Sequence, residues 1–173
     1  MKTLVVYRSK SGFSKAYADW IARTLNADLR EYRSVRPTQF VGYDTIIYGG
    51  GLYAVGINGI DLIKKNLDAL KDKRVIVFAT GASPITEETT SFILNRNFTA
   101  EQQRLIQFFY LRGGFDYSKL SAIDKLLMNL LKARLERKKE LTPDENGMLS
   151  AFDTPADFTK EQNLAPLLLS LRL

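Results

Sequence analysis

The chain contains neither cysteine nor histidine among its 173 residues. Without cysteine there can be no disulfide, no thiol nucleophile and no thiolate metal site. Without histidine, serine–histidine nucleophile systems and histidine-ligated metals are also excluded. An enzyme that lacks these side chains usually leaves the chemistry to a bound cofactor. We therefore expect no catalytic nucleophile and no metal site in this protein.

Long hydrophobic runs are also missing. The apolar stretch at residues 164–171 is interrupted by Pro166 and is too short to span a bilayer. The N-terminus enters an apolar strand at once and has no signal-peptide pattern, so we expect a cytoplasmic protein. With 45% hydrophobic and 25% charged residues, the composition is that of an ordinary globular domain.

Apolar strand patterns alternate with helical patterns along the chain. The expected strands cover residues 3–7, 27–32, 44–48, 74–79 and 104–112. The expected helices cover residues 14–25, 59–70, 86–95, 119–139 and 158–171. Such a series predicts an α/β fold with a doubly wound, five-stranded parallel sheet and helices on both faces. We expect one domain over residues 1–173, with a helical insertion or extension at about 113–151.

The first strand ends in a loop made of Ser9, Lys10, Ser11, Gly12, Phe13 and Ser14. Helical N–H groups and the positive end of the helix dipole would point into this loop, and its hydroxyls can donate to phosphate oxygens. The spacing excludes a Walker A loop and the dinucleotide fingerprint G-x-G-x-x-G. The pattern predicts a site for the phosphate of a mononucleotide-like cofactor, and an ordinary βα turn is the alternative.

Two further loops follow apolar strands and are expected at the same edge of the sheet, where doubly wound folds bind ligands. The second loop contains Gly51, Leu52, Tyr53 and Ala54. The third loop contains Thr80, Gly81, Ala82 and Ser83.

This combination resembles the flavodoxin family, whose phosphate loop reads [ST]-x-[ST]-G-x-[ST] after the first strand. The run Tyr43-Asp44-x-Ile46-Ile47-x-Gly49 is also similar to that family. The resemblance implies FMN bound non-covalently, with its phosphate in the first loop and its isoalloxazine ring between the second and third loops. Tyr53 would then stack on the ring. The implied function is electron transfer through FMN, with a redox partner protein or a small-molecule electron donor or acceptor.

The chain departs from that family in two respects. Flavodoxins usually carry a small polar residue, often Asn, where this chain has Phe13. Electron-carrier flavodoxins are typically acidic, whereas this chain has a formal net charge of +6. An acidic partner or an anionic surface is therefore expected.

The segment from Arg112 to Leu120 leads into a long helical pattern, Lys119 to Lys139, with an apolar stripe and a basic end. This layout is similar to the flavodoxin-like protoporphyrinogen oxidases, which implies a flavin-dependent oxidoreductase of the protoporphyrinogen oxidase or quinone reductase type. The stripe is Leu120, Ile123, Leu127, Leu130 and Leu131, and the basic end is Lys132, Arg134, Arg137, Lys138 and Lys139.

Three roles are open for this helix. It can contact a membrane surface peripherally, dock a partner for a binding module that lacks flavin, or pack its leucines and leave the lysines solvated. Nucleic acid is not expected as a partner, because the basic charge is concentrated at a helix end rather than interleaved with aromatics on an open sheet.

Overall fold

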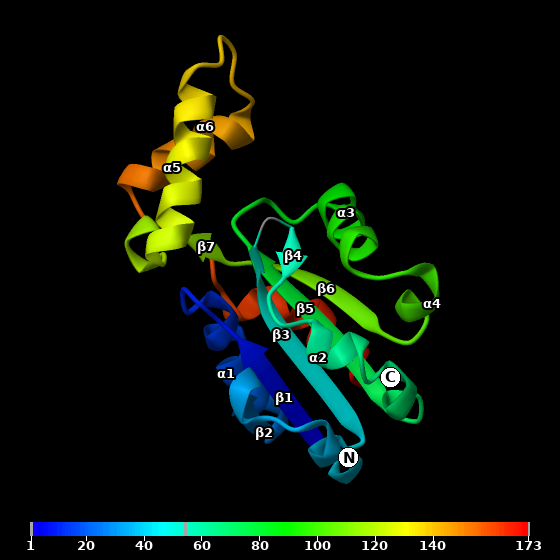
Figure 1. Cartoon of the computed structure of the whole chain (residues 1–173). Coiled ribbons are helices and arrows are strands. Elements are labelled where there is room, and N and C mark those ends of the chain that lie inside the picture. Colours follow the sequence, from blue (N-terminus) through cyan, green and yellow to red (C-terminus); the bar gives the residue numbers. More distant parts are fainter. Residues whose placement is uncertain (1, 54, 173) are drawn as a thin grey trace.

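The computed structural model describes residues 2–53 and 55–172 and contains a central parallel sheet with helices on both faces (Figure 1). The strand order is β2-β1-β3-β5-β6, and each of these neighbours pairs in parallel. The predicted α/β fold class is therefore confirmed. The strands are β1 (Thr3–Arg8), β2 (Asp28–Glu31), β3 (Thr45–Tyr53), β5 (Arg74–Gly81) and β6 (Gln107–Arg112).

Within the described residues a sixth strand, β4 (Gly56–Ile57), pairs antiparallel with the end of β3. The sequence did not predict it, because two residues are too few to show an alternating pattern. Strand β4 runs back along the end of β3, so that Leu52 and Tyr53 of the predicted second loop belong to a short hairpin.

Two apolar layers flank the sheet, because successive strand residues point to opposite faces. Val5, Ile47 and Phe78 face a layer formed by α1 (Phe13–Leu25), η5 (Glu161–Leu164) and α7 (Ala165–Ser170). The opposite face is covered mainly by η2 (Pro37–Gly42), α2 (Asp61–Lys64), η3 (Leu67–Leu70) and α3 (Glu87–Asn97). The remaining short elements near the sheet are η1 (Tyr32–Ser34) and α4 (Ala100–Gln103).

Two predicted helices are interrupted in the structure. The helix expected over residues 59–70 is split into α2 and η3, and the Asn66 side-chain amide donates to the Leu62 carbonyl oxygen at 2.7 Å near the break. Asparagine competes in this way for helical backbone groups. The helix expected over residues 158–171 consists of η5 and α7, with Pro166 in the first turn of α7, where its missing N–H costs no helical hydrogen bond.

The predicted helical extension leaves the sheet after β6 and contains two helices rather than one. Helix α5 (Ala122–Glu136) and helix α6 (Pro143–Asp153) lie beyond the carboxyl ends of the strands (Figure 1). A short antiparallel pair, β7 (Gly114–Phe115) and β8 (Ala156–Asp157), closes the extension at its base, next to η4 (Tyr117–Lys119). Thr142 and Glu145 form the capping box that starts α6. No helix in the described part of the chain combines the length and the hydropathy that a membrane span requires.

An ion pair between an exposed lysine and a buried aspartate fastens the extension to the first loop. The Nζ atom of Lys10 lies 2.9 Å from Oδ2 of Asp124, whose residue is only 4% exposed. A hydrogen bond from Lys10, together with one from Ser121, lowers the pKa of Asp124. A buried carboxylate is costly without a partner, and this one also lies in the first turn of α5, where the helix dipole favours negative charge.

Gly49 should not tolerate a side chain. It pairs with Phe78 across β3 and β5, and a Cβ atom at this position would overlap the Phe78 ring. We expect Gly49→Ala to lower the free energy of unfolding by about 1–3 kcal/mol, the usual cost of overpacking a core. Urea denaturation measures this. The control is Gly147→Ala in α6, where an added Cβ would have no atom within 4 Å apart from its chain neighbours and the backbone of its own helix. That change should be neutral or stabilising by about 0.5–1 kcal/mol, and an equal loss in both variants would contradict the packing argument.

The Lys10–Asp124 pair should make stability depend on pH. Because the folded-state pKa of Asp124 is lowered, its stabilising effect is complete above the ordinary aspartate pKa of about 3.9 and is lost as the pH falls through the lower folded value. Wild type should exceed Asp124→Asn in unfolding free energy near neutral pH, and the difference should shrink in acid. Urea titrations across this range test it. Asp153→Asn is the control, because the Asp153 side chain is 81% exposed; a difference independent of pH would refute the assignment.

Candidate functional site

The first loop presents unpaired helical N–H groups at the carboxyl end of β1. Gly12 precedes α1 in the left-handed region, with a φ of 97° that favours glycine. The Ser9 hydroxyl oxygen accepts a hydrogen bond from the Gly12 backbone N–H at 3.0 Å, which tightens the loop. Among the described residues, no side chain caps α1 and no acidic residue lies in its first turn. These N–H groups and the positive end of the helix dipole are therefore available to an anion.

The three predicted loops meet at one point. The Ser14 and Thr80 hydroxyl oxygens are 2.7 Å apart, although Ser14 lies in α1 and Thr80 lies near the end of β5. The strands are longer than the sequence predicted, so residues 51–53 end β3 and residues 80 and 81 end β5 instead of following these strands as loops. A Cβ atom added to Gly51 would lie 3.4 Å from the Ser14 hydroxyl oxygen and 3.8 Å from that of Thr80. Each loop thus contributes one residue to the same small region. The second and third loops also touch elsewhere, since a Cβ on Gly81 would lie 3.0 Å from the Leu52 side chain.

The hydroxyls of the first loop differ in their surroundings. Ser14 is buried and its hydroxyl is hydrogen-bonded to Thr80, so it links two loops. Ser9 and Ser11 are only partly buried, and Lys10 is exposed. Ser11 and the first-turn backbone groups are therefore the better-placed donors for an incoming anion.

Phe13 anchors the extension. Its side chain is buried, and a Cβ added to Gly114 in β7 would lie 2.7 Å from the Phe13 ring. The Lys119 ammonium lies 5.8 Å from the centroid of the same ring. An aromatic residue at this position is therefore explained by packing against the base of the extension, while the backbone donors of the loop are unaffected.

Tyr53 is the exposed aromatic residue of the second loop. It ends β3 with 44% of its surface exposed, and the Lys10 ammonium lies 4.4 Å from the centroid of its ring. Hydrogen bonding to Asp124 raises the pKa of Tyr53. Ala54, which the sequence also assigned to this loop, lies outside the described residues.

Sequence reasoning missed Asp124 as a neighbour of the site. In the structure Asp124 lies at the start of α5, where its N–H donates to the Ser121 hydroxyl oxygen at 3.2 Å. Lys10 and Asp124 are 114 positions apart, so no local pattern could reveal their contact.

The third loop is held in place from β6. The Tyr110 hydroxyl donates to the Ser83 carbonyl oxygen at 3.0 Å, and Arg112 Nε donates to the Ala82 carbonyl oxygen at 3.2 Å. Burial raises the pKa of Tyr110 to about 12, so its hydroxyl keeps its proton near neutral pH. Ala82 and Ser83 themselves are exposed and open to a ligand.

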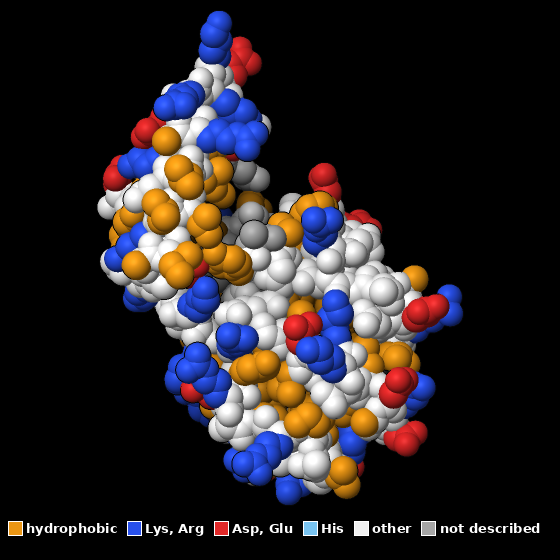
Figure 2. Space-filling view, viewed as in Figure 1, with side chains coloured by type: hydrophobic (Ala, Val, Ile, Leu, Met, Phe, Trp, Pro, Cys, Tyr) orange, Lys and Arg blue, Asp and Glu red, His pale blue; other side chains and the backbone are white. Residues whose placement is uncertain are grey.

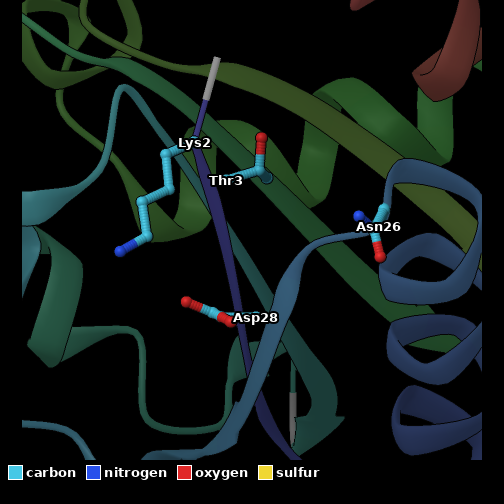
Figure 3. Close-up of a pocket in the computed structure, with 4 residues that line it drawn as sticks. All are labelled: Lys2, Thr3, Asn26 and Asp28. Atoms are coloured by element: carbon cyan, nitrogen blue, oxygen red, sulfur yellow. The ribbon is translucent and has the colours of Figure 1, made fainter.

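An open pocket of about 330 Å³ lies at the opposite edge of the sheet (Figure 3). Lys2, Thr3, Asn26 and Asp28 line it, from the starts of β1 and β2 and the end of α1. Doubly wound sheets bind ligands at the carboxyl ends of the strands, at the point where the strand order reverses. Here that point lies between β1 and β3, so the loop cluster is the candidate site and the pocket is not.

The chain matches a protein family and is similar to several solved structures. A family model described as a flavodoxin domain matches residues 4–142. The WrbA-like flavodoxin of Agrobacterium tumefaciens is similar at 20% identity and a TM-score of 0.48, covering 77% of this chain and 93% of that chain. Two-electron reduced Megasphaera elsdenii flavodoxin is similar at 14% identity and a TM-score of 0.45, covering 62% and 84%.

A third similar structure is a Lactobacillus acidophilus flavoprotein in complex with FMN, at 19% identity and a TM-score of 0.40, covering 64% of this chain and 91% of that chain. A comparison with curated proteins found no match. Because the flavodoxin-domain model matches most of the chain, this protein belongs to the flavodoxin family.

Proposed function

We propose that this protein binds FMN non-covalently and acts as a flavin redox protein. The observation that carries the proposal is the meeting of three loops at Ser14, Gly51 and Thr80, at the carboxyl ends of adjacent strands. Membership of the flavodoxin family supports the same cofactor. The chain has no histidine or cysteine that could carry out the chemistry instead.

The residues present fit an FMN group. The first loop offers backbone N–H groups and the Ser11 hydroxyl to a phosphate. Gly51 and Gly81 let the backbone of the other two loops approach a planar ring, and Tyr53 offers an aromatic face. When bound, FMN would supply hydride or single-electron transfer. The protein would orient the ring and exclude water from it.

In the first version of this proposal, the protein is an electron carrier that transfers electrons between redox partners through FMN. The alternative is a flavin-dependent oxidoreductase of the protoporphyrinogen oxidase or quinone reductase type. The contact between the extension and the first loop favours the alternative, because Asp124 brings α5 against the site. Turnover of protoporphyrinogen or a quinone by the FMN-loaded protein distinguishes the enzyme from the carrier.

The extension also presents an exposed apolar face. Four aliphatic residues on α5 have exposed fractions of 48–72% and recur at helical spacing, and Figure 2 shows hydrophobic side chains gathered there beside Lys and Arg. They are Ile123, Leu126, Leu127 and Leu130. Three of the stripe residues named from the sequence, Ile123, Leu127 and Leu130, are thus exposed rather than packed inward.

We propose that this face of α5 contacts an anionic membrane surface peripherally. An exposed apolar stripe with cations on the same helix is typical of interfacial helices, in which the aliphatic side chains enter the headgroup boundary. The cations attract anionic headgroups, which agrees with the net charge of +6. Contact there would bring the neighbouring cofactor site close to electron acceptors dissolved in the membrane.

Fluorescence titration tests the cofactor proposal. Wild type should quench FMN on binding. Ser11→Asp should weaken FMN binding at least about tenfold, because a carboxylate in the first loop repels the phosphate. Riboflavin, which lacks the phosphate, should be affected little. If wild type binds neither ligand, the flavin proposal is refuted and a flavin-free binding module remains.

Vesicle sedimentation tests the membrane proposal. The protein should bind vesicles containing phosphatidylserine and should bind pure phosphatidylcholine vesicles weakly. Replacing Leu126 and Leu130 by Asn should weaken binding at least about tenfold, because each buried Leu contributes about 1.5–3 kcal/mol. Val41→Asn is the control, since Val41 is 81% exposed and lies in η2, outside the extension. Equal binding by all variants would exclude α5 as the contact.

A further inference from the structure

The turn between β3 and β4 holds an unfavourable backbone conformation. Tyr53 pairs with Gly56, so only residues 54 and 55 connect the two strands. Val55 has a φ of 68°, in the left-handed region, where such tight turns normally place glycine. A β-branched residue is strained there, and it stays there only when its surroundings hold it.

The side chain of Asn97, which is distant in the sequence, stabilises this turn by hydrogen bonds. Asn97 is the last residue of α3 and is only 7% exposed. Its Nδ2 donates to the Val55 carbonyl oxygen at 2.8 Å, and its Oδ1 accepts from the Ile57 N–H at 2.8 Å. The same Nδ2 donates to the Ile93 carbonyl oxygen at 2.8 Å, which fixes the amide on its own helix.

The clamped turn carries the second loop of the candidate site. Ile57 pairs with Leu52 and Gly56 pairs with Tyr53. The site residues Leu52 and Tyr53 therefore lie in β3, directly opposite the strand β4 that Asn97 holds. Leu52 in turn lies against Gly81 of the third loop. A shift of the turn would therefore change the gap between the second and third loops.

We propose that Asn97 is a positioning residue for the flavin ring. It acts through the Val55 turn to hold Tyr53 and Leu52 at the correct distance from the third loop, and it does not itself touch the ring. This inference rests on the proposed binding of FMN. An amide suits the role because it donates to one backbone group of the turn and accepts from another.

Comparing FMN with riboflavin distinguishes a role of Asn97 at the flavin ring from an effect on the phosphate loop. Asn97→Ala would leave the Val55 carbonyl and the Ile57 N–H without their partner and would let Val55 relax out of the left-handed region. FMN and riboflavin should then both bind about tenfold more weakly, because the lost contacts are to the ring that they share. The visible absorption band of the bound flavin should also shift.

The experiment titrates FMN and riboflavin into wild type, Asn97→Ala, Val55→Gly and the double variant. Glycine adopts positive φ without strain, so Val55→Gly should restore most of the lost affinity in the Asn97→Ala background. Asn97→Asp keeps the acceptor for Ile57 but loses the donor to Val55, and it should show an intermediate loss. Asn66→Ala is the matched control, because its amide also donates to a helical carbonyl but lies outside the site.

Each outcome decides the proposal. Equal losses for both flavins with recovery by Val55→Gly support it. A lowered unfolding midpoint with unchanged flavin affinity and spectrum would reduce Asn97 to a structural role and overturn it. A loss for FMN alone would place the effect at the phosphate and also overturn it. If wild type binds neither flavin, the proposed function fails, and this inference fails with it.

Discussion

Parallel pairing of β1 with β3 and of β3 with β5 is the constraint on which the candidate site depends. It places three chain segments that are far apart in sequence at one edge of the sheet, and the reversal of strand order beside β1 leaves room between their loops. Both faces of these strands are buried, so apolar layers pack against them on either side. The strand ends that carry the three loops are thus anchored in the core.

The extension is joined to this edge by two kinds of contact. Phe13 packs into its base, and Lys10 pairs with a buried carboxylate at the start of α5. The aromatic residue that sets this chain apart from typical flavodoxins is thus used for packing, and the lysine beside it for an ion pair. The same short loop would serve the cofactor through its backbone and Ser11, and would hold the extension through its side chains.

The exposed apolar surface of this molecule is concentrated on the extension. The exposed aliphatic residues of α5 lie on the extension, whereas the aliphatic residues of the central strands are buried. Exposed apolar patches of this kind usually mark a contact with a partner or a membrane. Asp124 of α5 pairs with Lys10 of the first loop, so the exposed face of α5 lies near the candidate site. A partner or membrane bound to α5 would therefore be close to a cofactor held by the first loop.

The sequence by itself determined the α/β class and the order of the main strands, because apolar alternation and glycines are local signals. It placed the ends of β3 and β5 too early, since residues 51–53 and 80–81 continue these strands. It did not predict β4, the break after α2 or the separate α6, whose signals are short or depend on side-chain competition with the backbone. Only the tertiary structure decided that Asp124 meets Lys10, that Phe13 packs on Gly114 and that Asn97 clamps the Val55 turn. These contacts join residues about 40 to 114 positions apart, and such pairs are set by how packed layers bring elements together, which no local pattern encodes.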